Sequence, residues 1–402
     1  MRMERFSALN PQFPILDSRS TFPCQVLPGF GTHEDERRKM ISSDGRTWSA
    51  FVVDASAGFW FLAVLFLMCL GSAHSVFAAD QRTVLIVVGA AGEDRYVTEF
   101  NTWATNWVKA AERAHAKALT VGFPIVADEQ NTNSSSAELH EGGTVRDEFK
   151  RLLDAEPKDG TGELWLVLIG HGTFNGKEAK FNLRGADFSA TELAEWLRPF
   201  QRPQAILNCA SSSAPFINAL VSTNRIVAVS TRSGYEINYA RFGKFLSEAI
   251  GGSDGDLDKD GQTSLLEAFI MASKKAVEFY KNEERLVTEH ALLDDNGDGH
   301  GTPADWFRGV RAQKKPAQGN SLDGARAHQW HLVRSLDEEN LDSVTLARRN
   351  EIESSVTRLR DRKAELPEEV YYKQLETLLL DMARIYGKAT NGGASPPTEA
   401  VR

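Results

Sequence analysis

A cysteine and a histidine follow two apolar segments, and together they have the chemistry of a nucleophile and its base. Cys209 follows residues 204–208 (QAILN), and His171 follows residues 163–170 (ELWLVLIG). A thiolate attacks an acyl carbon, and a neighbouring imidazole assists it and protonates the leaving amine. Gly172 leaves a backbone N–H uncovered beside the imidazole, and with the N–H of Cys209 it would form an oxyanion hole. The pair therefore predicts an acyl-transfer site.

The elements that must position this pair are strands of a parallel sheet. Four apolar runs read as strands buried on both faces, and they lie at residues 82–89, 163–170, 204–208 and 225–230. Helical patterns separate them, so the predicted fold is an α/β, doubly wound, mostly parallel sheet with helices on both faces. The carboxyl ends of such strands share one edge. The 209 − 171 = 38 residues between the pair leave room for one crossover helix.

The local patterns place the helices of this sheet. Apolar residues recur at helical spacing over 96–118, a weak strand is expected over 119–127, and a short helix over 144–153. Ser189 and Glu192 have the spacing of a capping box that opens the crossover helix. Three serines after the cysteine, residues 211–213, are expected on a turn toward a helix N-terminus, which would favour the thiolate.

The N-terminal part of the chain predicts export. Residues 59–79 form the one long apolar run and end in small residues, which is typical of a signal peptide with its cleavage site. The alternative is an uncleaved N-terminal membrane anchor, although a spanning helix needs about 20 apolar residues. Residues 1–58 are interpreted as a disordered leader or the product of an over-long gene model. We therefore expect a periplasmic or extracellular protein.

The cysteine content sharpens the interpretation of the thiol. The chain has three cysteines, Cys24, Cys69 and Cys209, and the first two lie before or within the predicted signal. The mature chain would carry Cys209 alone, without an intramolecular disulfide. A lone thiol in an exported protein is either an inert buried side chain or a nucleophile. His171 and Gly172 favour the nucleophile.

A second kind of chemistry is predicted for residues 256–267 (DLDKDGQTSLLE), which fit the pattern of an EF-hand calcium loop. In that pattern carboxylates stand at positions one, three and five, a glycine makes the turn at position six, and a glutamate closes the loop at position twelve. Helical sequence flanks both sides. The predicted Ca²⁺ ligands are Asp256, Asp258, Asp260, Gln262 and Glu267, with Ser264 acting through water.

A second acidic segment, residues 294–300 (DDNGDGH), repeats the first half of this pattern. Its candidate Ca²⁺ ligands are Asp294, Asn296, Asp298 and the carbonyl of His300. Asp305 stands where the closing glutamate would be, but Pro303 precedes it. Calcium binding and a solvated acidic turn both remain open here.

The net charge and the C-terminal region bear on which macromolecules the protein could bind. The net charge is −9, which gives no indication of nucleic-acid binding. A polar linker at 314–327 precedes a helical, charged region at 328–388 that is broken near Pro367, and a disordered tail follows at 389–402. Its apolar positions predict an antiparallel helical hairpin, which could pack as an appendage or support self-association.

Three segments carry a resemblance to a known family. Residues 164–172 (LWLVLIGHG), 205–213 (AILNCASSS) and 83–95 (TVLIVVGAAGEDR) resemble the legumain family of caspase-fold cysteine peptidases, over roughly residues 82–245. The resemblance implies that His171 and Cys209 are the catalytic dyad and that Gly172 is the oxyanion glycine. Family members usually carry Glu or Gln after the cysteine, where this chain has Ala210.

The resemblance also implies where substrate would bind. Arg95 lies in the loop after the first strand, and Ser230 and Glu236 follow the fourth strand, so these three are the candidate substrate-binding residues. Because the pocket residue after the cysteine is altered, a preference for asparagine does not follow.

The sequence thus predicts an exported cysteine endopeptidase of the legumain or caspase-like type, stabilised by Ca²⁺ and acting on a peptide or protein. Its expected domains are a caspase-like domain at 80–245, an EF-hand-like region at 246–313, the linker and the helical hairpin. Two alternatives stay open: a transpeptidase that uses the same acyl-enzyme, and a non-catalytic calcium-binding protein on a caspase-like scaffold. Contact with a membrane is expected only if the signal is not cleaved.

Overall fold

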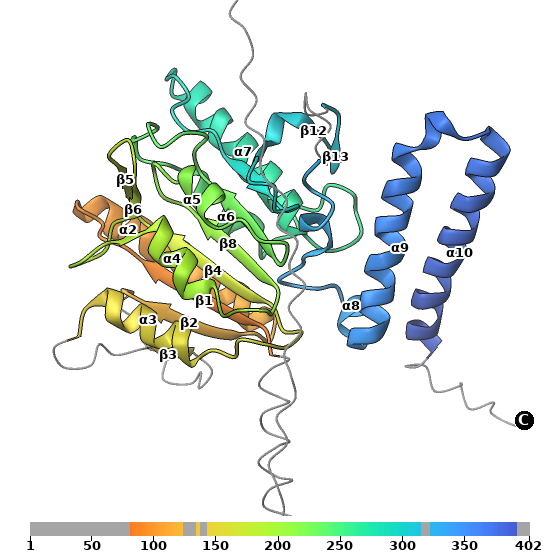
Figure 1. Cartoon of the computed structure of the whole chain (residues 1–402), viewed down its shortest axis with the longest axis horizontal. Coiled ribbons are helices and arrows are strands. Elements are labelled where there is room, and N and C mark those ends of the chain that lie inside the picture. The colour runs from red at the N-terminus through yellow and green to blue at the C-terminus, as the bar shows by residue number, and fades with distance from the viewer. Residues whose placement is uncertain (1–80, 124–133, 137–142, 315–321, 392–402) are drawn as a thin grey trace, which may run out of the picture. The chain divides into compact units, whose positions relative to one another are not determined.

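The computed structural model describes residues 81–123, 134–136, 143–314 and 322–391 (Figure 1). The predicted leader, the predicted signal, Cys24, Cys69 and the last eleven residues lie outside these ranges. Within the described ranges, no helix combines the length and the apolar character that crossing a membrane requires.

An eight-stranded mixed sheet forms the centre of the described chain, in the order β11-β10-β9-β8-β4-β1-β2-β3. The strands from β9 to β3 run parallel, whereas β10 pairs antiparallel with β9 and β11 pairs antiparallel with β10. The parallel strands are β1 (Thr83–Val88), β2 (Lys117–Val121), β3 (Ser134–Ser136), β4 (Leu164–Ile169), β8 (Gln204–Asn208) and β9 (Arg225–Val229). The antiparallel edge is β10 (Leu292–Asp294) and β11 (Thr302–Pro303).

Helices cover both faces of this sheet, as expected for strands that are apolar on both sides. One face packs against α2 (Asp94–Arg113), α6 (Phe242–Ala249) and α7 (Leu265–Asn282). The other packs against α3 (Val145–Ala155), α4 (Ala190–Leu197) and α5 (Pro215–Ala219). The prediction of an α/β sheet with helices on both faces is therefore confirmed.

Sequence capping signals locate the helix starts well. Ser189 caps α4 through the predicted capping box: its hydroxyl accepts from the Glu192 N–H, and the Glu192 carboxylate accepts from the Ser189 N–H. Ser264 caps α7 in the same way with Glu267. Both boxes hold a buried helix end, where an unpaired N–H would be costly.

One helix ends earlier than predicted. The expected helix over 96–118 stops at Arg113, and β2 already begins at Lys117. His115 has a φ of 50°, a left-handed conformation that ends the helix. The helical spacing of the alanines in this stretch continues past the break, which is why the periodicity alone did not reveal it.

The antiparallel edge joins the predicted calcium region to the sheet domain. β10 and β11 lie within residues 246–313, and Leu293 of β10 packs in the same core as α2 and α7. The boundary expected at residue 245 therefore does not separate two cores. Two smaller sheets lie outside the central one: β5 (Gly172–Phe174), β6 (Ala179–Phe181) and β7 (Phe188–Ser189), and β12 (Phe307–Arg308) with β13 (Arg311–Ala312).

The C-terminal region contains two long helices. α9 (Ser343–Asp361) and α10 (Glu368–Asn391) pack side by side, with Pro367 in the turn between them (Figure 1). Ile352, Val356 and Leu359 of α9 are buried. Short elements complete the described chain: η1 (Ala304–Trp306), η2 (Ala327–Gln329), α8 (Leu336–Glu339) and η3 (Lys363–Glu365).

Candidate active site and the acidic loops

The two predicted catalytic residues follow neighbouring parallel strands at the same edge of the sheet. β4 pairs with β8 so that Leu168 lies opposite Asn208, and His171 and Cys209 come directly after these strands. The loops that carry them touch: a Cβ on Gly172 would lie 2.3 Å from the carbonyl oxygen of Ser211. Glycine at 172 is therefore required for the close approach.

The thiol of Cys209 faces the core between the sheet and two helices. The residue is 1% exposed and belongs to the apolar cluster beneath α2 and α6. A Cβ on Gly243 of α6 would lie 2.5 Å from the Cys209 Cβ and 3.1 Å from its sulfur, and 2.9 Å from the Trp103 ring. Burial, and next to it the charge of Glu289, raises the pKa of the Cys209 thiol to about 12.

The imidazole of His171 lies in an aromatic cluster on the same face of the sheet. Its ring centroid is 5.1 Å from Tyr96, 5.4 Å from Phe100 and 5.8 Å from Tyr239. Nε2 lies 3.2 Å from the carbonyl oxygen of Ala91, so this nitrogen carries the proton and donates it there in the neutral ring. Burial lowers the pKa of His171, and the Ala91 carbonyl partly opposes that shift.

In this conformation the dyad and the oxyanion hole are not assembled. Within the described chain no hydrogen bond joins His171 to Cys209. The Cys209 N–H donates to the Leu168 carbonyl at 2.9 Å, as part of the sheet ladder. The Gly172 N–H is 3.2 Å from the Ser211 hydroxyl, which accepts from it and donates to the Gly172 carbonyl. Both predicted oxyanion donors therefore already have partners.

The serines after the cysteine form a tight buried turn rather than a thiolate-stabilising one. Ser212 has a φ of 55° and its N–H donates to the Glu236 carbonyl. The Ser213 hydroxyl bonds Thr231 and accepts from the Ser230 N–H. The α5 helix that follows has only five residues. The expected lowering of the thiol pKa is wrong for this conformation, because desolvation outweighs a short helix dipole.

The three candidate substrate residues differ in exposure. The Arg95 side chain is 64% exposed, pairs with Glu93 and lies over the Tyr96 ring. Ser230 is fully buried and donates its hydroxyl to the Asn208 carbonyl. Glu236 accepts from the His290 ring and N–H and from the Arg232 N–H. Of the three, Arg95 is the one that a ligand can reach.

A cavity of about 250 Å³ opens beside the histidine, at the carboxyl end of β1 and the start of α2. Ala91, the hydrogen-bond partner of His171, and Phe100, its ring neighbour, both line it, as do Arg184 and the 89–94 loop. Ligands of open α/β sheets bind outside the carboxyl ends of strands, so this is the candidate binding cavity.

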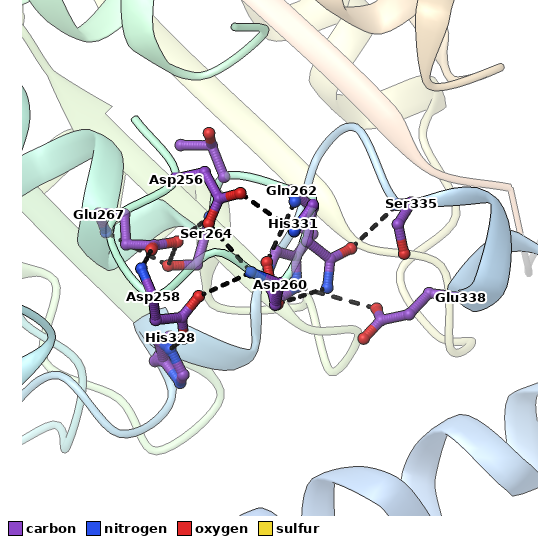
Figure 2. Close-up of polar contacts among 12 residues, drawn as sticks. Asp256, Asp258, Asp260, Gln262, Ser264, Glu267, His328, His331, Ser335 and Glu338 are labelled. Atoms are coloured by element: carbon purple, nitrogen blue, oxygen red, sulfur yellow. Dashed lines mark hydrogen bonds and ion pairs between the residues drawn. The ribbon is translucent and has the colours of Figure 1, made fainter. Parts of the chain in front are cut away.

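The first acidic loop (residues 256–267) is a tight turn that brings three carboxylates together. Lys259 and Gly261, at positions four and six, have φ values of 65° and 89°. One carboxylate oxygen each from Asp256, Asp258 and Asp260 lies within 4.8 Å of the others (Figure 2). The loop's turn is held by backbone N–H groups of Asp260 and Gly261, which donate to the Asp256 carboxylate.

The ends of the first acidic loop differ from an EF-hand. α7 begins at Leu265 within the loop, as the exit helix should, but α6 ends at Ala249, seven residues before Asp256. A pair of helices flanking the loop is therefore not shown. Glu267 is 1% exposed and accepts from the Leu257 and Asp258 N–H groups and from Ser264. Gln262 bonds Asp260 through its side-chain NH₂ and the Ser335 N–H through its oxygen.

In the second acidic loop (residues 294–305), residues 295–301 connect β10 to β11, so the acidic segment is followed by a strand and not by an exit helix. Asp294 is buried and accepts from the N–H groups of Gly297 and Gly299. The Asn296 side chain accepts from Asp298, and the Asp298 carboxylate accepts from the N–H of His300. The Asp305 side chain is 69% exposed and pairs with Lys314, so it does not close the loop.

Two histidines beside the first acidic loop were not predicted. His328 and His331, three residues apart after the polar linker, lie against Asp258 and Asp260. Their spacing, H-x-x-H (HQWH), is the signal that could have drawn attention to them. This spacing does not indicate contact with the first acidic loop, which lies about 70 residues earlier and is brought next to the two histidines by the fold.

Comparison of the chain with protein-family models and with curated proteins gives no match. The resemblance to legumains therefore stays a prediction that depends on the three segments quoted for it.

Proposed function

We propose that the chain is an exported cysteine endopeptidase of the caspase-like, legumain type, with Cys209 as nucleophile and His171 as general acid and base. The observation that carries the proposal is the shared position of the two residues. They follow adjacent parallel strands on the same face and at the same edge of the sheet, and their loops are in contact. Two separate segments of the sequence, 164–172 and 205–213, supply the pair and its glycine.

The state of the imidazole supports this role. The Ala91 carbonyl accepts the proton of Nε2, so Nδ1 is left as the basic nitrogen of the neutral ring. A lowered pKa keeps that ring neutral at pH 7, as a general base requires. The aromatic rings of Tyr96, Phe100 and Tyr239 fix its orientation.

The described conformation corresponds to a resting enzyme. The thiol is protonated and covered by Gly243 and Trp103, and the oxyanion donors are engaged elsewhere. For catalysis, α6 must withdraw from Cys209 and the sulfur must turn toward His171. A peptide that enters the cavity beside Ala91 approaches the sheet edge where this happens, so we propose that substrate binding drives the change.

Two alternatives remain for the same fold, a transpeptidase and a non-catalytic scaffold. A transpeptidase would pass the acyl group from Cys209 to an amine, and none of the described residues at this edge favours water over an amine. A non-catalytic scaffold is favoured by one observation, the complete burial of the thiol. Reactivity of Cys209 toward peptide electrophiles separates this scaffold from both enzymes.

We also infer that the carboxylates of the first acidic loop hold a divalent cation that stabilises the fold. Oxygen ligands on a flexible loop are typical of Ca²⁺, whose 2.3–2.6 Å bonds span about 4.6–5.2 Å between opposite ligands. One carboxylate oxygen from each member of the triad lies within 4.8 Å of the others, which is close enough for one such ion to contact all three. Loss of a calcium-dependent rise in melting temperature in Asp256→Ala tests this inference.

The enzyme proposal is tested by labelling the purified protein with a library of peptide acyloxymethyl ketones, followed by mass spectrometry of the Cys209 peptide. We expect label on Cys209 in the wild type, loss of label in His171→Ala, and no label in Cys209→Ala. The same thiol should react fully with iodoacetamide after unfolding, which shows that it is not oxidised. Absence of label in the native wild type under every condition, with full reaction after unfolding, would favour the scaffold.

The resting state makes a separate prediction for pH. Because burial raises the pKa of Cys209 to about 12, the thiolate fraction rises about tenfold for each pH unit below that value. Alkylation of the ligand-free protein by iodoacetamide should therefore keep accelerating from pH 7 to pH 10. A plateau below pH 9 would contradict the buried thiol.

A further inference from the structure

One short segment of the chain contacts both predicted catalytic residues. This covering segment, residues 239–243, leads into the first turn of α6. Its first residue, Tyr239, packs against the imidazole of His171, with ring centroids 5.8 Å apart. Its last residue, Gly243, is so close to Cys209 that an added Cβ would lie 3.1 Å from the sulfur. Displacement of this one segment would therefore remove a contact from both members of the pair.

A buried carboxylate from a later part of the chain holds the covering segment in place. The N-cap residue of α6, Arg241, makes no side-chain capping bond, so the N–H groups at the helix start need another acceptor. Glu289 supplies it. This residue is 3% exposed, and its carboxylate accepts from the Arg241 N–H at 2.8 Å and from the Phe242 N–H at 2.9 Å. Because Glu289 follows Arg241 by 48 residues, the cap is a tertiary contact.

A second carboxylate holds the other end of the covering segment. The Tyr239 hydroxyl donates to the carboxylate of Glu99, which belongs to α2. The Tyr239 ring also packs against Tyr96 of the same helix, with centroids 4.3 Å apart. The segment is thus fixed at both ends by carboxylates from other elements, and of these two Glu289 is the one that acts on the start of α6.

The contact at Glu289 places a negative charge where water is excluded. Burial raises the pKa of Glu289, and the N–H groups of Arg241 and Phe242 oppose that shift. The same charge adds to the effect of burial on the Cys209 thiol, whose pKa is raised as well. Opening of the covering segment would admit water to both groups and relieve both shifts. The cost of burying Glu289 therefore lowers the free energy that this opening requires.

We propose that the covering segment is an autoinhibitory latch: Glu289 holds the start of α6 over Cys209, and local opening of the segment, without unfolding of the sheet, gives access to the thiol. A peptide substrate binds the open form and shifts the population toward it. Glu289 is a positioning residue here, because it acts through the backbone of α6. The regulatory role rests on the proposed peptidase, whereas the opening itself requires no catalysis.

The first test measures how fast iodoacetamide alkylates Cys209 in the native full chain at one fixed pH. Mass spectrometry of the Cys209 peptide gives the rate, so Cys24 and Cys69 do not contribute. Glu289→Ala should raise this rate at least about tenfold, because the helix start loses two charge-assisted hydrogen bonds. An unchanged rate in a folded Glu289→Ala protein would overturn the latch.

Glu156→Ala is the matched control for general loss of stability. Glu156 is as buried as Glu289, but it binds Lys117 and Arg202 at the amino end of the sheet, away from α6. Urea denaturation shows whether both variants fold. We expect the alkylation rate of the folded Glu156→Ala protein to change less than about twofold. An equal acceleration in both variants would show that Glu289 acts through global stability, and this would also overturn the latch.

A second measurement needs only the wild type. Local opening exposes little surface, so the alkylation rate of Cys209 should rise only slightly with urea below the unfolding transition. Alkylation through global unfolding would instead rise with the full slope of equilibrium unfolding. A full slope would overturn the latch even if Glu289→Ala does not fold.

Labelling by a peptide acyloxymethyl ketone separates the latch from the peptidase. Faster alkylation of Glu289→Ala together with faster ketone labelling would support both proposals. Faster alkylation without ketone label in either protein would support the opening and contradict the peptidase. Ketone label on the wild type, with alkylation that Glu289→Ala leaves unchanged, would overturn the latch and leave the peptidase standing.

Discussion

The two acidic loops share the backbone conformation and hydrogen bonds of their first halves, but their second halves lead into different elements. In both, the residue at position one accepts from the N–H at position six, position five accepts from the N–H at position seven, and positions four and six have positive φ. The first acidic loop then closes on the buried Glu267 and a long helix. The second returns as a strand of the central sheet and leaves Asp305 in solvent.

The comparison shows that residues within the loop determine its turn, whereas the element that follows determines whether a carboxylate stands at position twelve to close it. Short-range hydrogen bonds from backbone N–H groups to aspartate and asparagine side chains, with glycine where φ is positive, are sufficient for the first six residues. The last ligand and any outside donors depend on which element follows and what packs on it. Differences between equivalent positions of the two loops are therefore the way to test the interpretation.

The largest difference is expected at position twelve. Glu267→Ala leaves the N–H groups of Leu257, Asp258 and Ser264 without their buried acceptor. We expect the free energy of unfolding in EDTA to fall by about 3 kcal/mol, measured by urea denaturation. Asp305→Ala should leave the denaturation midpoint unchanged, since its carboxylate is exposed. Equal losses of stability in the two variants would contradict the conclusion that Glu267 closes its loop and Asp305 does not.

The next difference is expected at position four. A Cβ on Gly297 would lie 2.9 Å from the Ser222 carbonyl oxygen, and its φ is 75°. Gly297→Ala should therefore lower stability by about 2–3 kcal/mol, through the clash together with the left-handed strain. Lys259, at the same position of the first acidic loop, shows that a side chain is accepted there. A fully stable Gly297→Ala protein would contradict the close packing of the second loop.

A smaller difference is expected at position one. Asp294 is 2% exposed and accepts hydrogen bonds from two N–H groups. Asp256 also accepts hydrogen bonds from two N–H groups, but it is more exposed than Asp294. In EDTA we expect Asp294→Ala to cost about 2 kcal/mol and Asp256→Ala about 1 kcal/mol. Thermal unfolding followed by circular dichroism measures both. The reverse order would mean that burial does not distinguish the loops.

The smallest expected effect is a gain. Lys259 has a φ of 65°, and its Cβ raises the free energy of this left-handed conformation. Its side chain is exposed, so burial does not offset that strain. Lys259→Gly should raise stability by about 0.5–1 kcal/mol in EDTA and make the first acidic loop resemble the second. A loss of stability would show that the Lys259 side chain contributes a contact.

Much of the sheet could be predicted because its strands are continuous apolar runs. The segments predicted at 163–170, 204–208 and 225–230 contain β4, β8 and β9 within one residue or so at each end. The antiparallel edge could not be predicted, because β10 and β11 have three and two residues and their pairing is set by the second acidic loop. Strands that short carry no periodic signal.

The candidate site was predictable in its residues but not in its state. Strand order and the edge rule place His171 and Cys209 together. The orientation of the thiol depends on what covers that face, and Gly243 of α6 covers it through a contact that no local sequence pattern indicates. The Gly172 N–H is engaged by the Ser211 hydroxyl, and the Cys209 N–H donates to the Leu168 carbonyl of the neighbouring strand. Such contacts are long-range and leave no local pattern.

The last strand of the sheet, β11, has a consequence for how molecules of this protein meet. An edge strand normally presents free N–H and C=O groups, and these recruit strands of other chains. β11 is two residues long, and Pro303 has no N–H to donate. Intermolecular sheet extension, the first step of many aggregates, is therefore blocked at this edge. The second acidic loop, a candidate ion site, thus ends in a strand that does not pair with the sheets of other molecules.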